Sequence, residues 1–338
     1  MEINENTDIM VDTDINVNKD IEVDTDIKVN KDIKVNIKLM SFKEKIDYFG
    51  TFPNYPQKSK EWLKQRNSYL TASTIHNALG LCGKVANFNL LKEKVTYISS
   101  FNGNIATQWG NKYEYVANRI YSKLNNDFQI YEFGLIPSEQ YPILAVSPDG
   151  ITETGKLIEI KCPYSRVIDN KIKPEYYSQM QEQLVVCDFD ECDFIECKIN
   201  EFGIEEFKNN IQINKEKMFP DFKYGIVISY LNVNTNSDIL YKYSAINDEN
   251  LFEWEQNTIN EIENNVDLFY IQSSYYECTI FSIKMVKRDV EWINKNYPIL
   301  EQFWNKVLEC RDVGIIEPES PKISPTINDV INNFICLI

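Results

Sequence analysis

The sequence predicts an α/β (α+β) fold in which a mixed central sheet is flanked by helices and followed by a helical extension. Between residues 60 and 200, segments with apolar residues at helical spacing alternate with short segments of strand period, and a long helical stripe follows near residue 300. The chain has 338 residues, of which 43% are hydrophobic, so it can bury a sizeable core.

The composition and patterning of the sequence divide the chain into three parts. Residues 1–40 contain a 12-residue repeat that occurs at 11–22 and again at 23–34. Two copies are too few for a stacked repeat fold, so we expect a low-complexity, disordered tail. Residues 41–215 are predicted to form the core domain, and residues 216–338 a hairpin plus helical extension packed on that core.

In the core domain, helices are predicted around 60–65 and over 106–124, where apolar residues recur at helical spacing. Two strands follow, Ile143–Val146 and Leu157–Lys161, joined by a turn that contains Gly150 and Gly155. The two strands place the polar residues between them next to a buried sheet.

The second half of the chain continues this alternation. Pro174 predicts the start of a helix to about Val186, because proline fits the first helical turn, and 193–199 alternates like a strand. The segments 225–231 and 238–243 predict a hairpin. The final helix has an apolar stripe, which we expect to pack in the core: Ile299, Leu300, Phe303, Trp304, Val307 and Leu308.

Charge is unevenly distributed along the chain. The net charge of −16 argues against a nucleic-acid partner for the chain as a whole. Residues 58–173, however, carry 15 basic and 10 acidic residues, whereas residues 174–338 carry 13 basic and 29 acidic residues. The basic stretch is either a chance fluctuation or a local phosphate-binding surface.

Several classes of protein are excluded by the same sequence. It has no run of 18 apolar residues, so no transmembrane helix is expected, and its acidic start lacks the apolar region of a secretory signal. Eight cysteines in such a chain are expected to be free thiols in a reducing, intracellular compartment. The spacing of Cys187, Cys192 and Cys197 is not that of a zinc site.

The stretch that carries chemistry is Ser-Pro-Asp-Gly at 147–150 with Leu-Ile-Glu-Ile-Lys-Cys-Pro at 157–163. Side chains two apart on a strand share a face, so Glu159 and Lys161 project together, and a hairpin can bring Asp149 beside them. Two carboxylates, with the backbone carbonyl of Ile160 and waters, suit Mg²⁺, and Mn²⁺ as a substitute. The alternative is a turn-forming Asp149 and a solvated Glu-x-Lys face.

This arrangement is typical of the PD-(D/E)xK nucleases, and the chain resembles the YqaJ viral recombinase family, which includes the phage lambda exonuclease. The resemblance covers about 58–200 and consists of four blocks in family order. The blocks are Trp62, Arg66 and Leu70–Ser73; Trp109–Glu114; Ser147–Gly150 with Glu159–Pro163; and Tyr176–Gln181. The family implies a restriction-endonuclease-like core.

The resemblance implies roles for single residues. Glu114, Asp149 and Glu159 match the metal-binding acids, Lys161 the catalytic lysine, and Gln181 a residue that helps to hold the nucleophile and phosphate. Gln181 could instead be a core glutamine bonded to backbone. The positions implied to hold phosphate or DNA are Arg66, Ser73, Ser147 and Gln179. Their alternatives are a surface charge for Arg66 and a helix cap for Ser73.

The resemblance therefore implies a Mg²⁺-dependent deoxyribonuclease that hydrolyses phosphodiester bonds of double-stranded DNA from its ends, in the 5′-to-3′ direction, in viral DNA recombination or repair. A single-strand annealing protein and a homo-oligomer are implied as partners. Two alternatives remain open: a structure-selective endonuclease on the same fold, and a catalytically silent DNA-binding scaffold. Lys84, Lys112, Arg166, Lys171 and Lys173 could follow the DNA backbone.

Overall fold

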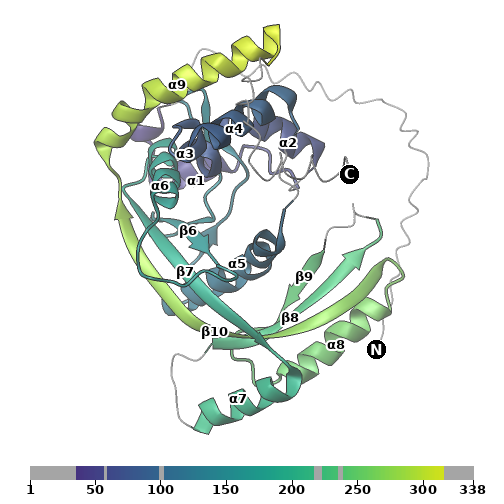
Figure 1. Cartoon of the computed structure of the whole chain (residues 1–338). Helices are drawn as coiled ribbons and strands as arrows, with labels where there is room; N and C mark the ends of the chain where they lie inside the picture. Colours follow the sequence, from purple (N-terminus) through teal and green to yellow (C-terminus); the bar gives the residue numbers. More distant parts are fainter. Residues whose placement is uncertain (1–35, 57–58, 99–102, 217–222, 235–238, 316–338) are drawn as a thin grey trace, which may run out of the picture. The chain divides into compact units, whose positions relative to one another are not determined.

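The computed structural model describes residues 36–56, 59–98, 103–216, 223–234 and 239–315. The 12-residue repeat lies outside the described residues, as does the predicted disordered tail except for residues 36–40. The described residues, from Asn36 onward, form one compact unit. Its mixed sheet with flanking helices confirms the predicted α/β fold class (Figure 1).

A seven-stranded sheet forms the centre of this unit, in the order β2-β5-β6-β7-β10-β8-β9. Strands β6 and β7 pair in parallel, and the other neighbours in this sheet are antiparallel. The bounds are β2 (Ile130–Tyr131), β5 (Gly150–Thr152), β6 (Leu157–Lys161), β7 (Glu191–Phe202), β8 (Lys223–Asn232), β9 (Leu240–Tyr243) and β10 (Leu268–Lys287). The predicted strands at 157–161, 193–199, 225–231 and 238–243 are thus confirmed.

A small sheet of β1 (Leu70–Thr71), β4 (Leu144–Val146) and β3 (Ile136–Pro137) lies beside it. The expectation that β4 and β6 form one hairpin is wrong. Gly150 does not lie in the turn but begins β5, which pairs with β6, and the turn is made by the residues around Gly155, whose φ is +82°. The chain therefore leaves β4 for the larger sheet at the segment 147–149.

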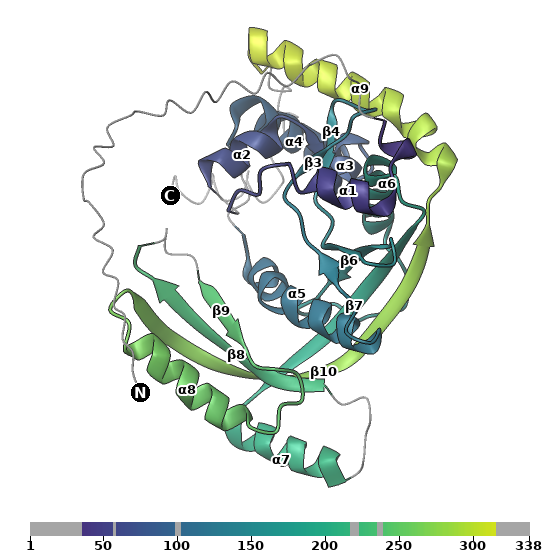
Figure 2. The same ribbon diagram turned by 180° about the vertical axis from the view of Figure 1, so that it is seen from behind.

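Six helices gather at one end of the unit (Figure 2). Their bounds are α1 (Phe42–Phe49), α2 (Lys60–Asn67), α3 (Ile75–Ala78), α4 (Lys84–Thr96), α6 (Pro174–Cys187) and α9 (Val290–Val313). A short 3-10 helix, Ala72–Thr74, leads into α3. These elements enclose one hydrophobic core, to which α6 contributes Met180, Leu184 and Val185.

The other helices cover the large sheet. Helix α5 (Ile105–Leu124) packs on β6 and β7 around Tyr113 and Ile120. Helices α7 (Ile204–Glu216) and α8 (Leu251–Glu263) pack with β8 and β10 around a separate core. In both ribbon views these two helices lie against the end of the sheet that is far from α9 (Figures 1 and 2).

The longest strand, β10, was not anticipated from the sequence. Its first part pairs with β8 and its second part with β7, and the segment Tyr275–Cys278 pairs with both. The strand curves along the whole length of the unit in Figure 1. It therefore joins the two ends of the sheet through one continuous hydrogen-bonded ribbon.

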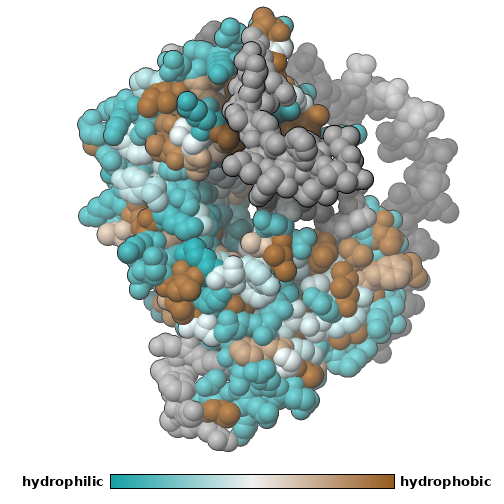
Figure 3. All heavy atoms as spheres, viewed as in Figure 1, coloured by the Kyte–Doolittle hydropathy of each residue, from teal (hydrophilic) through white to brown (hydrophobic). Residues whose placement is uncertain are grey.

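The surface of the unit is mostly polar with apolar groups between. Hydrophobic residues appear over the free end of β8, β9 and β10 in Figure 3, where Val233, Ile239, Phe269 and Ile271 are exposed. In the described part of the chain no helix is long and apolar enough to cross a membrane. None of the seven described cysteines is in a disulfide.

Candidate active site

Strand β6 positions the central pair of charged side chains. Ile158 and Ile160 pack into the core beneath α5, so Glu159 and Lys161 project from the opposite face, as predicted. Glu159 is wholly buried. One of its carboxylate oxygens accepts a hydrogen bond from Lys161 Nζ, and the other accepts from Gln183 Nε2 at 2.8 Å.

Asp149 reaches the same place from the segment before β5. Its Oδ2 accepts a hydrogen bond of 2.6 Å from the backbone N–H of Ile160. The segment thereby brings the Asp149 carboxyl to the backbone N–H of the residue that lies between Glu159 and Lys161 on β6. Burial, together with the negative charge of Glu159 and Glu114, raises the pKa of Asp149 well above its usual value.

Two further charges belong to this group. Burial alone would lower the pKa of Lys161, but the carboxylates of Glu159 and Asp149 raise it above the usual lysine value, so the ammonium keeps its charge. Glu114, on α5, is partly open to solvent. The protein packed around its carboxyl group, which displaces water, raises its pKa to about 7; Lys161 opposes this shift, and Glu159 and Glu132 add to it.

A hollow of about 340 Å³ opens over Asp149 and Glu114. It is also lined by all four residues expected to hold phosphate or DNA: Arg66, Ser73, Ser147 and Gln179. Arg66 stacks its guanidinium on Trp62, 4.7 Å from the ring centroid, and its Nη2 donates to Thr71 Oγ1 at 3.2 Å and to Ser73 Oγ at 2.9 Å. The α2 helix and the segment before α3 thus hold one cationic fork over the carboxylates.

A second hollow of about 800 Å³ shares Arg66, Ser73 and Glu114 with the first and extends along Lys161 and the segment 162–166. Tyr176 lies on its wall with three cations near the ring, Lys161 at 5.3 Å, Lys173 at 5.8 Å and Arg166 at 5.9 Å. The hollow therefore combines positive charge with an aromatic face, which suits a nucleic-acid strand.

In the residues that the structure describes, no three or more His, Cys, Asp or Glu side chains form a group that could hold a metal ion by themselves. The pair Asp149 and Glu159 still fits a hard cation. Both are carboxylates, and the negative charge of Glu159 raises the pKa of Asp149, a repulsion that a bound cation would relieve. Such an ion would need backbone oxygen and water as further ligands.

Residues 61–190 match the family model of the YqaJ-like viral recombinase domain. The resemblance expected from the sequence is confirmed by this match, which covers α2 to the start of β7 and so includes every residue of the group around Glu159.

One curated relative is an uncharacterized protein of Acanthamoeba polyphaga mimivirus, 30% identical over 304 residues. The alignment covers 79% of this chain and 55% of that protein, so the chain spans about half the length of the relative. Among solved structures, an alkaline exonuclease from Laribacter hongkongensis covers 75% of this chain and 95% of its own, with a TM-score of 0.47 and 18% identity. A phage-related exonuclease from Haemophilus somnus covers 74% of this chain and 98% of its own, with a TM-score of 0.42 and 13% identity.

Within the matched region, Gln181 does not join the other predicted site residues. It is wholly buried on α6, where its Nε2 donates to the Lys287 carbonyl at 2.9 Å and its Oε1 accepts from the Asp289 N–H at 2.7 Å. Both ends of the amide are used by the junction of β10 and α9. Gln181 is therefore the core glutamine bonded to backbone, which was the alternative interpretation.

Gln183 is the residue that sequence reasoning missed. It lies two positions further along α6 and holds the second oxygen of Glu159. The only available signal was its place in a Gln-rich stretch, Gln179, Gln181 and Gln183, on a helix that had to face β6.

Lys112 is also placed differently from its expected role along DNA. It is buried and ion-paired with Glu201 at 2.6 Å, and its Nζ also contacts Ser274 Oγ. Its charge is compensated inside the protein, so it is not free for a phosphate. Arg166 is paired with Glu196 at 2.6 Å but still lines the larger hollow.

Proposed function

We propose that the protein is a Mg²⁺-dependent deoxyribonuclease that hydrolyses phosphodiester bonds of duplex DNA, digesting from 5′ ends in viral DNA recombination or repair. The observation that carries the proposal is the meeting of Asp149 and Lys161 with the buried Glu159 on β6, where Asp149 and Lys161 each line a hollow that Arg66 and Ser73 also line. The match of residues 61–190 to the YqaJ-like viral recombinase domain supports the same class of activity.

Asp149 and Glu159, with the Ile160 carbonyl and support from Glu114, would hold Mg²⁺ or Mn²⁺. When bound, the ion would polarise a phosphoryl oxygen and lower the pKa of water. Lys161 keeps its positive charge through its carboxylate neighbours, so it can donate to a phosphate oxygen or orient the attacking water. Glu114, with a pKa of about 7, can exchange a proton near neutral pH.

Arg66 is the residue best placed for a terminal phosphate. Its Nη2 is anchored on Thr71 and Ser73, and within the described residues its Nε and Nη1 have no acceptor. Two free donors of a fixed guanidinium match two oxygens of a phosphate dianion. Ser73, Ser147 and Gln179 supply further hydrogen-bonding groups around the same hollow.

The proposal is tested by incubating the purified full chain with end-labelled linear duplex and Mg²⁺. We expect digestion that Lys161→Ala and Asp149→Ala each reduce by at least about a hundredfold. Lys156→Ala is the matched control, because this lysine lies on the adjoining turn and pairs with Glu191 outside both hollows. Undiminished digestion by both site variants would rule the mechanism out.

Two substrate comparisons refine the same experiment. A 5′-phosphorylated duplex should be digested faster than a 5′-hydroxyl duplex, and Arg66→Lys should reduce that ratio by about tenfold because the fork geometry is lost. Cleavage of a branched, covalently closed circle would instead favour the structure-selective endonuclease, since such a substrate has no end.

A further inference from the structure

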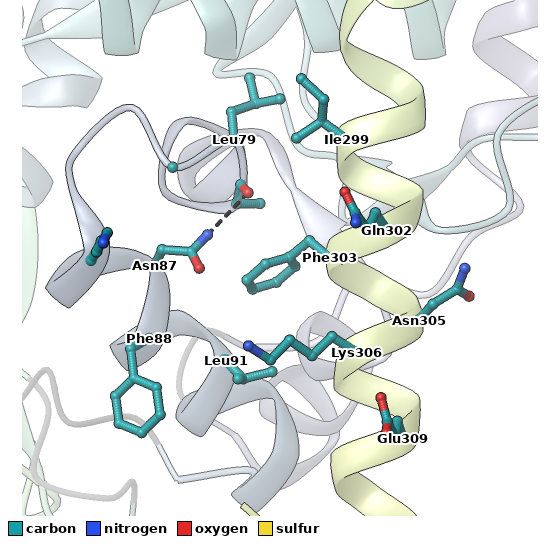
Figure 4. Close-up of a pocket in the computed structure, with 13 residues that line it drawn as sticks. Leu79, Asn87, Phe88, Leu91, Ile299, Gln302, Phe303, Asn305, Lys306 and Glu309 are labelled. Carbon is teal, nitrogen blue, oxygen red and sulfur yellow. Dashed lines mark hydrogen bonds between the residues drawn. The ribbon is translucent and has the colours of Figure 1, made fainter. Parts of the chain in front are cut away.

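An apolar groove lies between α4 and α9, away from the carboxylate group. Its volume is about 840 Å³. Phe303 and Ile299 project from α9, Phe88 and Leu91 from α4, and Leu79 closes one end, as Figure 4 shows. The amide of Asn87 donates to the backbone carbonyls of Asn77 and Ala78 and so does not need a ligand.

The groove leaves apolar surface uncovered. Ile299 belongs to the stripe expected to pack in the core, yet 44% of it is exposed, while Leu300, Phe303, Trp304 and Val307 of the same stripe are buried. Leu79 and Ile299 also line an adjoining hollow that contains Leu81 and Trp292. The two hollows therefore form one apolar strip, which fits an elongated apolar partner.

A segment of matching character occurs in the same chain. Residues 327–338 lie outside the described residues, but their sequence has apolar residues at positions i, i+3, i+4, i+7, i+8, i+10 and i+11. This spacing is typical of an amphipathic helix, and Pro325-Thr326 before it provides a helix start with a capping hydroxyl. The apolar stripe consists of Ile327, Val330, Ile331, Phe334, Ile335, Leu337 and Ile338.

We propose that the segment 327–338 docks as a helix in the groove between α4 and α9 of its own chain. The lengths agree: twelve helical residues span about 18 Å, and Ile299 to Glu309 on α9 span about 15 Å. The charges agree too, since Asp329 is the one charged residue of the segment, and the groove is lined by two cations, Lys84 and Lys306, against one acid, Glu309.

The connection also permits this docking within one chain. The α9 wall of the groove ends at Glu309, close to the end of α9 at Val313. Residues 316–326 can extend over about 35 Å, which exceeds the distance needed to turn back along the helix. A tether of this length gives an effective concentration in the millimolar range, so the segment of the same chain outcompetes that of a second copy.

The test is backbone amide hydrogen exchange of the full chain, followed by mass spectrometry of peptides that cover 327–338. We expect these amides to exchange at least about tenfold more slowly than in the free peptide. Ile331→Asp in the segment and Ile299→Asp in the groove should each restore fast exchange.

Each variant has a matched control. Asn332→Asp adds the same charge to the polar face of the segment, and Leu308→Asp changes an α9 residue that is also 44% exposed but does not line the groove. Both should keep the slow exchange. The segment variant cannot act by unfolding the groove, because the groove itself is unchanged.

Two results would overturn the proposal. Fast exchange of 327–338 in the unmodified protein would show that the segment does not dock at all. Slow exchange that appears only as the protein is concentrated over a roughly fiftyfold range, together with a dimer by light scattering, would assign the groove to a second copy.

Discussion

Glu159 is a wholly buried carboxylate whose two oxygens accept hydrogen bonds from Lys161 on β6 and Gln183 on α6. A buried carboxylate is tolerated only when such donors compensate its lost hydration. Gln183 thus fixes the direction of Glu159 from the side opposite to Lys161. It acts as a positioning residue for the proposed metal ligand.

Gln183→Met should therefore lower nuclease activity by about ten- to a hundredfold, the usual cost of losing a group that orients a metal ligand. The measurement is the digestion rate at increasing Mg²⁺, where we expect a higher Mg²⁺ requirement. Gln181→Met is the control: it should lower the free energy of unfolding by about 1–3 kcal/mol while the rate per folded molecule stays nearly unchanged. Equal rate losses in both variants would contradict this division of roles.

Lys94 is a buried cation whose Nζ donates to the Arg66 carbonyl at 2.8 Å. Burial, with the positive charge of Arg66 and Arg311, lowers its pKa from 10.5 to about 8, against the opposite effect of Glu93 and Glu182. Below pH 8 both the folded and the unfolded chain carry the proton, and the folded state bears the full cost of the buried charge. Between pH 8 and 10.5 the folded chain releases the proton first, so stability rises with pH.

The expected rise is on the order of 3 kcal/mol in the free energy of unfolding, relative to a Lys94→Met variant measured over the same pH range. The comparison with the variant cancels the titration of tyrosines and cysteines. Denaturant titrations at several pH values provide the measurement. Parallel pH profiles for the two proteins would show that burial does not shift Lys94.

The sequence predicts some site residues well and others poorly. Glu159 and Lys161 were predictable because strand geometry places residues two apart on one face. Gln181 and Gln183 were not separable, because residues two apart on a helix point in nearly opposite directions and both lie in an apolar setting. Which of them meets Glu159 depends on where β10 and α9 pack, and that is a property of the tertiary fold.

At the scale of elements, the β5–β6 hairpin sets the position of Asp149. Gly150 pairs with Ile158, and a Cβ on Gly150 would come within 2.5 Å of Ile130 Cγ2 and 2.9 Å of Ile158 Cδ1. The strand can approach its neighbours only because it begins with glycine. The neighbouring Asp149 is held at the carboxylate group by this close approach.

Gly150→Ala should therefore destabilise the protein by about 1–3 kcal/mol through overpacking and should also reduce nuclease activity. Thermal unfolding and the digestion assay measure the two effects. Gly110→Ala is a suitable comparison, because a Cβ there meets no atom within 4 Å. The prediction would be wrong if both variants melted alike.

The helix predicted over 106–124 was found from its regular apolar spacing, and the helix predicted from Pro174 to about Val186 from the proline at its start; the structure has them at 105–124 and 174–187. Strand β10 was missed even though it is rich in aromatic and β-branched residues. Its first half is largely exposed, and the register of its pairing with β7 shifts between Cys278 and Ile280. Buried and exposed residues therefore do not alternate strictly along the strand. The three-residue β5 is too short to leave any periodic signal.

At the scale of the whole molecule, the uneven charge has a structural counterpart. The basic stretch 58–173 supplies Arg66, Lys161, Arg166 and Lys173 to the larger hollow. The acidic residues of the second half are used partly as internal partners of these and other cations, as in Glu196 with Arg166 and Glu201 with Lys112. A net negative protein can thus present a locally positive hollow.

Mg²⁺ or Mn²⁺ should raise the melting temperature of the protein, because an ion bound only by the folded state stabilises that state. At an ion concentration a hundred times the dissociation constant, the free energy of unfolding should rise by about 2.7 kcal/mol. A chelator should reverse the shift, and Asp149→Asn with Glu159→Gln should abolish it. Calorimetric titration on the same variants checks the binding directly. An equal shift in the doubly substituted protein would place the ion elsewhere.

Strand β10 has one more implication, for shortened forms of the chain. It lies more than fifty positions after β7 ends, yet it hydrogen-bonds along all of β7, the strand that supports β6 and its charged pair. Cutting the chain near residue 215 would remove β10 and leave β7 as a long, unpaired edge strand, which can hydrogen-bond to other chains. Recombinant fragments that end near residue 215 should therefore aggregate, and only a fragment that retains both β10 and the core helix α9, through residue 313, should stay dispersed.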